Sequence, residues 1–388
     1  MKELIILNKR FFLESISAFY PMSEDFINKY SNYLDWFGAD YPEFGISNNE
    51  KINWNLKFIW ENKNKFNWAG LSANNAISWN DESIKKFEEY IDFEYLSMNS
   101  NVEWNEKLLE KYKTKLDWQF LSQESFPFDD NLLEKYKKEI WWSVLPNNPH
   151  INWTIELAEK YINEGYLSTI PNISDLKITS DFVNIFGEKI SWSSLSWNTS
   201  VIWTPDLLEK HKGRLDWSGI SMNSSIPWSD SLIENLKDYL IWNDPSNGSL
   251  SRNEKLPWTE QLIEKYYHKW NWESLSENEG LCWSEQLIDR YKNIWTWGFQ
   301  HVYSGLSSNK GLPWSNHLIE KYEDLWDWDE ISLNESIHWS TSLVKKYRHK
   351  WHYINLISNH KVYEDLFSNI SEENLSHYFN HYIENYRE

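Results

Sequence analysis

The sequence predicts an all-α protein in which about 14 tandem units of about 25 residues stack as an α-solenoid, each unit with one long and one short helix. Three observations predict this fold class. Tryptophan recurs at a spacing of 25 residues, a helix-capping residue follows each of these tryptophans, and apolar residues then recur at helical spacing. A helix pair of this size cannot bury its large side chains alone, so stacked units must share one continuous core.

Two aromatic columns define the unit, and the second follows the first by 14 residues. We number positions within a unit from its first-column residue, which is position 0. After a degenerate unit that begins at Met22, the first column contains Trp54, Trp79, Trp104, Phe128, Trp153, Ile178, Trp203, Trp228, Trp258, Trp283, Trp314, Trp339 and Tyr363. The second column contains Trp36, Trp68, Phe93, Trp118, Trp142, Leu167, Trp192, Trp217, Trp242, Trp272, Trp297, Trp328 and Tyr353.

The first helix of each unit is expected to begin just after the first-column residue. The next residue is Asn, Asp, Thr or Ser, as at Asn55, Thr259 and Ser315. Such side chains accept hydrogen bonds from the free N–H groups at a helix start. We expect about ten helical residues, with an apolar stripe at positions 4, 5, 8 and 12 and a solvent-facing Glu at position 6.

A second, shorter helix is expected at the second-column residue. A cap-like Asp or Asn precedes most members of this column, as at Asp117 and Asn271, and a Ser-x-Asn element follows, as at Ser276 and Asn278. Ser and Asn side chains readily satisfy backbone groups in turns. We favour a turn-closing role for these asparagines, with recognition of an extended peptide backbone as the alternative.

The repeats occupy most of the chain. We assign residues 21–363 to repeat units within a single solenoid that spans residues 1–388. Residues 1–20 form an expected N-terminal helical cap, and residues 364–388 form an expected C-terminal cap at the other end.

Charge and composition limit the classes of partner. The formal net charge of −20 would repel the phosphates of nucleic acids and of anionic membranes, so we expect neither as a partner. A protein or peptide, including a basic one, is compatible with this charge. The chain lacks an apolar run of about 18 residues, and its single cysteine, Cys282, cannot form an internal disulfide. We therefore expect a cytoplasmic location.

No catalytic or metal-binding motif is evident. His349 and His352, and His377 and His381, lie at ligand spacing, but no carboxylate or cysteine completes a recognisable set. Phosphate-binding loops and nucleophile motifs are also missing from the sequence. We therefore expect a protein that is not an enzyme and that holds neither a cofactor nor a metal ion.

The segment from Leu306 to Trp328 displays the motif LSxNxxLPWSxxLIEKYxxxWxW. This motif resembles Trp-rich tandem repeats of about this length in uncharacterised proteins of bacteria and large DNA viruses, and the resemblance extends over about residues 20–365. At a coarser level the chain is similar to the broad class of helical interaction repeats. The resemblance implies an α-solenoid and a binding role, and it carries over no functional residues.

Most tryptophans fit the columns and are expected to be structural. The predicted structural core comprises Trp54, Trp79, Trp104, Trp153, Trp203, Trp228, Trp258, Trp283, Trp314 and Trp339. Trp60, Trp141 and Trp197 fall outside every column: they replace a solvent-facing Glu, a helix cap and the variable residue of Ser-x-Asn, respectively. Exposed tryptophan is enriched at interfaces, so these three are candidate partner-binding residues, with local packing as the alternative.

Insertions mark a second candidate surface. The second-column residue normally precedes the next first-column residue by 11 positions, but by 18 after Trp36, 16 after Trp242 and 17 after Trp297. Insertions in repeat proteins often map to the binding face, although harmless loop growth is the alternative. The candidate partner-binding residues carried by these insertions are Phe37, Tyr41, Phe299, His301 and Tyr303.

These observations favour a non-catalytic protein-binding scaffold with an acidic surface. One alternative is an immunity or defence factor that caps a basic toxin or nuclease, and another is a carbohydrate-binding module that uses the stray tryptophans. The recurrent Glu-Lys dipeptides have two interpretations: a solvated face with ion pairs between neighbouring units, or an acidic strip that docks a basic partner.

Overall fold

A computed structural model describes residues 9–37, 45–168, 177–244, 248–298 and 304–386. These residues are all-helical, with two isolated parallel β-bridges, Trp79 with Val102 and Ile178 with Val201, and no β-strand. Within the same ranges, no helix has both the length and the apolar character needed to cross a membrane. The chain forms two compact parts: residues 1–140 with 337–388, called the terminal part, and residues 141–336, called the middle part.

The helices follow the unit pattern in both parts. The terminal part contains α2 (Lys9–Phe19), α3 (Glu24–Tyr30), η2 (Ile46–Asn48), α4 (Leu56–Glu61), α5 (Trp68–Ala73), α6 (Asp81–Lys86), α7 (Phe93–Leu96), α8 (Glu106–Tyr112), α9 (Trp118–Phe120), η3 (Leu121–Ser125), α10 (Asp130–Lys135), α23 (Thr341–Lys346), α24 (Tyr353–Ser358), α25 (His360–Leu366) and α26 (Glu372–Tyr386). The middle part contains η4 (Leu145–Asn147), α11 (Ile155–Asn163), α12 (Ser180–Phe186), α13 (Trp192–Trp197), α14 (Pro205–His211), α15 (Trp217–Met222), α16 (Asp230–Leu236), η5 (Leu250–Arg252), α17 (Glu260–Lys265), α18 (Trp272–Glu277), α19 (Glu285–Arg290), α20 (Gly305–Ser308), α21 (Asn316–Lys321) and α22 (Trp328–Leu333).

The first helices of the units from Trp54 to Trp339 begin where the sequence predicts. In each of them the side chain after the first-column residue accepts a hydrogen bond from a backbone N–H two or three residues later, as Thr259 does from Leu262. These caps are Asn55, Asn80, Asn105, Asp129, Thr154, Thr179, Thr204, Ser229, Thr259, Ser284, Ser315 and Ser340. Each cap satisfies an N–H group that the helix itself leaves unpaired. The prediction is wrong at Tyr363, because α25 is capped by Asn359 and begins at His360.

The expected length of the first helices is wrong. In the unit of α17 and α18 both helices have six residues, so the predicted contrast between long and short helices is lost there. It is kept in other units, such as that of α16, with seven residues, and η5, with three. The end of the first helix shows the reason. The indole N–H of the second-column Trp272 donates to the carbonyl oxygen of Tyr267, five residues earlier, at 3.3 Å, and Trp217 does the same to Lys212 at 3.1 Å. A side chain thus takes a carbonyl that a continuing helix would use.

The predicted core stripe is confirmed. Leu262, Ile263, Tyr266 and Trp270, at positions 4, 5, 8 and 12, are all buried. Five first-column tryptophans are buried and five are half-buried: the buried ones are Trp79, Trp153, Trp203, Trp258 and Trp339, and the half-buried ones are Trp54, Trp104, Trp228, Trp283 and Trp314. All ten therefore contribute large apolar surface to the core.

The Ser-x-Asn element joins neighbouring units. The amide of Asn223 donates to the carbonyl oxygens of Ser196 and Asn198 in the preceding unit, at 2.9 and 3.1 Å, and its Oδ1 accepts from Ser225 N at 2.9 Å. Asn99 makes the equivalent bonds to Ser72 and Asn74. The predicted turn closure is confirmed, and the amide also fastens the preceding unit. Because Asn223 and Asn99 are buried, neither can read a peptide backbone.

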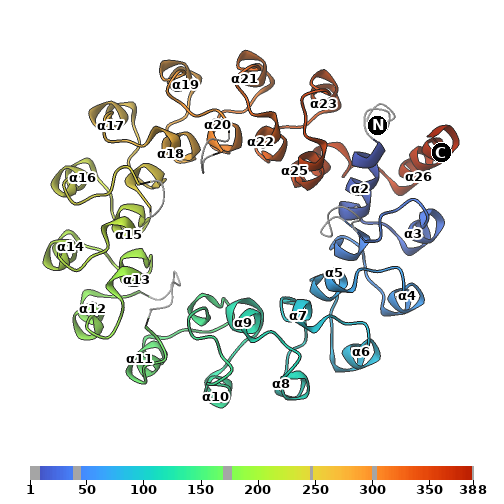
Figure 1. Ribbon diagram of the computed structural model, residues 1–388, viewed down its shortest axis with the longest axis horizontal. Coiled ribbons are helices and arrows are strands. Elements are labelled where there is room, and N and C mark those ends of the chain that lie inside the picture. The colour runs from blue at the N-terminus through green and yellow to red at the C-terminus, as the bar shows by residue number, and fades with distance from the viewer. Residues whose placement is uncertain (1–8, 38–44, 169–176, 245–247, 299–303, 387–388) are drawn as a thin grey trace. The chain divides into compact units, whose positions relative to one another are not determined.

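Helices of one kind form rows. Within the middle part, the first helices α14, α16, α17, α19 and α21 lie in one row, and the second helices α15, α18 and α22 lie in a second row beside it (Figure 1). Second helices contact one another directly, as α18 contacts α20 and α20 contacts α22.

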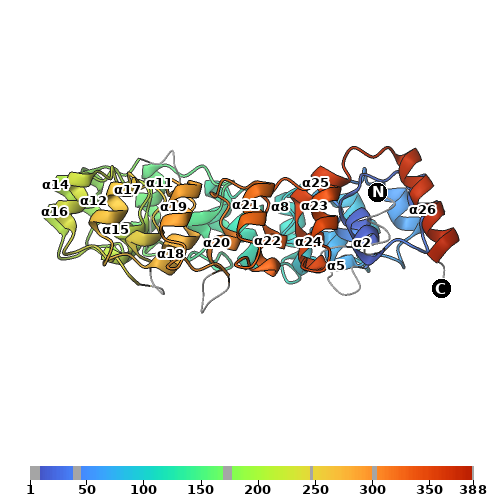
Figure 2. The same ribbon diagram turned by 90° about the horizontal axis from the view of Figure 1, so that it is seen from above.

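The first and last segments of the chain pack together within the terminal part. Tyr20 Oη donates to the carbonyl oxygen of Ile370 at 2.7 Å, Ser23 Oγ donates to Glu372 at 2.6 Å, and the rings of Phe12 and Phe379 lie 5.5 Å apart. Both views show α26 beside the N-terminal helices (Figures 1 and 2). The sequence interpretation placed these segments at two different ends, because contacts across about 350 residues leave no local pattern.

Candidate binding surfaces

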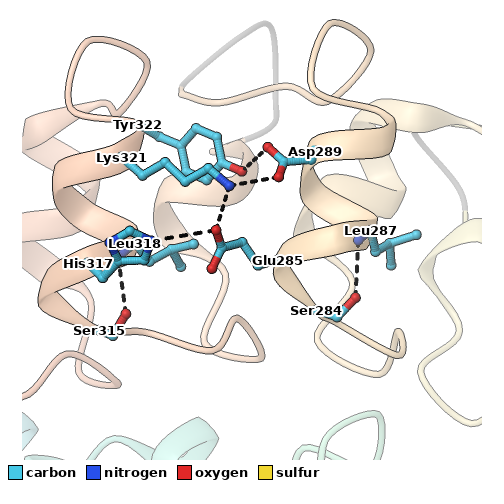
Figure 3. A network of polar contacts seen from close by, with 9 residues as sticks. All are labelled: Ser284, Glu285, Leu287, Asp289, Ser315, His317, Leu318, Lys321 and Tyr322. Atoms are coloured by element: carbon cyan, nitrogen blue, oxygen red, sulfur yellow. Dashed lines mark hydrogen bonds and ion pairs between the residues drawn. The ribbon is translucent and has the colours of Figure 1, made fainter.

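An ion-paired ladder connects the first helices of neighbouring units. In the middle part, Lys321 Nζ lies 2.7 Å from Asp289 and also contacts Glu285, and Tyr322 Oη donates to Asp289 at 2.6 Å (Figure 3). Position 6 of one unit thus carries the acid, and positions 7 and 8 of the next carry its Lys and Tyr partners. The same triad recurs as Glu234 with Lys265 and Tyr266, and as Glu110 with Lys135 and Tyr136.

These contacts shift the pKa values of both the acidic residues and the tyrosines of the ladder. Hydrogen bonds from Lys237 and Lys265 lower the pKa of Glu234 to about 2. Burial, together with the hydrogen bond to Asp289, raises the pKa of Tyr322 to about 12. The carboxylates of Glu110, Glu234 and Asp289 are therefore engaged by neighbouring units, which confirms the interpretation of ion pairs between units at these positions.

The ladder changes between the units that begin at Trp54 and Trp79. Position 6 of the first of these units is Trp60 instead of an acid, and positions 7 and 8 of the next are Lys86 and Phe87. Lys86 Nζ lies 5.3 Å from the centroid of the Trp60 ring, and the Phe87 ring meets it edge-on at 5.6 Å. Ring contacts thus replace the ion pair and the hydrogen bond of the ladder.

A pocket of about 620 Å³ opens beside Trp60. Lys63 Nζ lies 3.6 Å from the Trp60 ring centroid and 5.3 Å from that of Tyr90. Glu88 is paired with Lys111 and Lys115, and the hydrogen bond from Lys115 holds the pKa of Glu88 below its ordinary value. The complete lining is Trp60, Lys63, Lys85, Lys86, Glu88, Glu89, Tyr90 and Lys115.

The pocket holds uncompensated positive charge. In the described part of the chain, Lys63, Lys85 and Lys86 form no ion pair, and Lys85 stands at position 6, where most units carry an acid. Residues 51–115 contain ten lysines and ten acidic residues and so have no net charge, whereas the whole chain carries −20. The pocket therefore lies in a stretch that lacks the acidity of the rest of the protein.

Trp197 packs against its neighbours. Its indole Nε1 donates to Asp216 Oδ2 at 3.4 Å. A Cβ atom at Gly219 or Gly248 would lie 2.7 or 2.6 Å from its ring, so both glycines leave room for the indole. Burial acts to raise the pKa of Asp216, but hydrogen bonds from Ser193, Gly219, Ser218 and Trp197 hold it below its ordinary value. Although the side chain remains 41% exposed, local packing explains it.

The other sequence-predicted candidates do not join the pocket. Trp141 and Phe37 are exposed, at 50% and 51%, and neither is part of its lining. The carbonyl oxygen of Trp141 accepts hydrogen bonds from Val144 and Leu145 in a turn. Four candidates lie outside the described residues: Tyr41, Phe299, His301 and Tyr303.

Sequence reasoning singled out Trp60 but missed the lysines around it. The missing signal lies in the same columns: Lys85 replaces the acid of position 6, and Phe87 replaces the tyrosine of position 8. Joint departures from the consensus at contacting positions mark the pocket, but the sequence shows them also at Asn184 and His211.

No group of three or more His, Cys, Asp or Glu side chains in the described ranges could hold a metal ion. Comparisons of the chain with protein-family models, with curated proteins and with solved structures find no match.

Proposed function

We propose that this protein is a non-catalytic protein-binding scaffold, built as an α-solenoid of about 14 capped units of the Trp-rich repeat type. The repeated bonds of the buried asparagines, such as Asn99 and Asn223, support the stacking of equivalent units. The columns that dominate the sequence are used for this stacking, which leaves binding to positions that depart from them.

The observation that carries the proposal is the pocket at Trp60. A tryptophan that is 39% exposed lies beside lysines that no carboxylate of the described residues neutralises. Exposed aromatic side chains bordered by charged groups are typical anchors of protein interfaces. By contrast, the ladder carboxylates are already paired, which weakens the case for an acidic strip that caps a basic toxin. Lys63 covers one face of the Trp60 ring, which disfavours sugar stacking.

Affinity capture with the full-length chain from native lysate tests the scaffold proposal. We expect a protein partner that binds the purified chain at a defined stoichiometry in calorimetry. Trp60→Ala should weaken binding by about 2 kcal/mol, whereas Tyr95→Ala, at an aromatic residue that is 42% exposed and does not line the pocket, serves as the matched control. If no purified candidate binds the folded chain, the scaffold proposal fails.

A further inference from the structure

We infer that the Trp60 pocket binds a short acidic segment of a partner protein, with carboxylates on Lys63, Lys85 and Lys86 and an apolar side chain against Trp60. This inference rests on the proposed scaffold function and names the chemistry of its partner. It runs against the net charge of the chain, which by itself favours a basic partner.

The local charge decides between these two expectations. Lys63 and Lys86 approach the same ring, at 3.6 and 5.3 Å from its centroid, so one ligand can reach both. The Debye length is about 8 Å at physiological salt, so acids in distant units act weakly on the pocket. Its own stretch, residues 51–115, is neutral. A carboxylate in the pocket therefore meets mainly the unpaired ammonium groups.

The size of the pocket suits a few side chains. A volume of about 620 Å³ falls within the range of typical ligand sites. The edge contacts of Trp60 with Phe87 and Tyr90 hold its ring in place, while its exposed surface remains available. A held aromatic side chain loses little conformational entropy when a ligand covers it.

A peptide fits this lining better than a nucleotide. The eight lining residues include no Arg for bidentate phosphate contacts, no Gly for a phosphate-binding loop and no Asn or Gln to read a base edge, although lysine can bind phosphate as a point charge. Glu88 and Glu89 also line the pocket and would repel a polyphosphate. The carboxylates of a peptide are single charges spaced along a chain, so they can meet the lysines and avoid these acids.

The test uses the full-length protein and fluorescence anisotropy. The probe is a labelled peptide with four aspartates around one phenylalanine, and its reference replaces the aspartates with lysines. We expect the aspartate peptide to bind more tightly and to weaken as salt rises. Lys85→Glu combined with Lys86→Glu should weaken it at least about tenfold. Lys57→Glu is the matched control, because Lys57 lies on α4 with Trp60 but is paired with Glu61 and does not line the pocket.

A second variant separates binding from folding. Trp60→Glu combined with Phe87→Tyr restores the ladder consensus, so it should fold normally and lose the aspartate peptide. Equal binding of the two peptides, wild-type affinity in both double variants, or tighter binding of ATP than of the aspartate peptide would each overturn the inference. A captured partner that still binds both double variants would sink the pocket assignment and leave the scaffold standing. Binding of the aspartate peptide without any protein partner would support the pocket assignment and contradict the scaffold proposal.

Discussion

Positions 6, 7 and 8 of the units form the ion-paired ladder in one region of the molecule and border an open pocket in another. In the middle part, Asp289, Lys321 and Tyr322 satisfy one another across two units. In the terminal part, Trp60, Lys86 and Phe87 occupy the equivalent places and leave an unpaired lysine beside an exposed ring. The difference teaches that side-chain changes on the first helices can replace the ion-paired ladder by a pocket while the apolar stripe of the core is kept.

The largest expected effect is a loss in the free energy of unfolding when a core tryptophan is removed, compared with the smaller loss at the pocket. Trp203 is 3% exposed, so Trp203→Ala should lower the free energy of unfolding by about 3–5 kcal/mol. Trp60→Ala removes a partly exposed ring and should cost no more than about 1–2 kcal/mol. Urea denaturation monitored by circular dichroism measures both. Equal losses would show that Trp60 belongs to the core, and this outcome would contradict the distinction between the core and the pocket.

Removal of a buried asparagine of the Ser-x-Asn element should have the next largest effect on stability, and this effect should be the same in the terminal and middle parts. Asn99→Ala and Asn223→Ala each leave buried carbonyl oxygens of the preceding unit without their donor. We expect each substitution to lower the free energy of unfolding by about 1–3 kcal/mol. Asn316→Ala, at an exposed asparagine, is the control and should be nearly neutral. A loss at only one of the two sites would mean that the units are not fastened alike.

Alkaline titration of tyrosines distinguishes the ladder from the position at Phe87. Burial and hydrogen bonds to neighbouring carboxylates raise the pKa of Tyr136, Tyr291 and Tyr322 to about 12, from an ordinary value of 10.0. A raised pKa means that the folded state favours the neutral phenol. This stabilisation is therefore complete below pH 10 and is lost as the pH rises towards 12.

Ultraviolet absorbance of tyrosinate against pH measures these late titrations. Tyr322→Phe should remove one of them and cost about 1 kcal/mol at neutral pH. Phe87, which stands where the ladder carries its tyrosine, has no phenol, so position 8 of that unit cannot contribute to the alkaline loss. Titration of all tyrosines near the ordinary value would show that the ladder does not persist in solution.

The smallest effect concerns the stability of the restored ladder. Trp60→Glu with Phe87→Tyr adds an exposed ion pair with Lys86 and one hydrogen bond, and it removes ring contacts. We expect the free energy of unfolding to change by less than about 1 kcal/mol, because exposed pairs contribute little. Thermal unfolding provides the comparison. A large loss would indicate that the aromatic contacts of Trp60 are structural.

Local signals predicted much of the fold. The cap at Thr259 and the buried pair Leu262 and Ile263 depend on residues within a few positions of one another, so periodicity revealed them. The length of the first helix was not predictable in this way, because the indole of Trp272 takes the carbonyl of Tyr267, just past the helix end, which a longer helix would use. Among the stray tryptophans, Trp60 and Trp197 carried the same sequence signal but differ in the structure. Gly219, one unit later, makes room for Trp197, whereas Phe87 and Lys86 flank Trp60.

The sequence by itself determined the all-helical class, the helix starts and the core stripe, because each follows from contacts between residues close in the chain. Only the tertiary structure decided which groups meet across units. Asn223 reaches Ser196 27 residues away, and Lys63 and Lys86 converge on one ring from two units. It also decided that Tyr20 meets Ile370, 350 residues away. Such contacts depend on how units pack, and side-chain packing across long separations is not encoded in a local period.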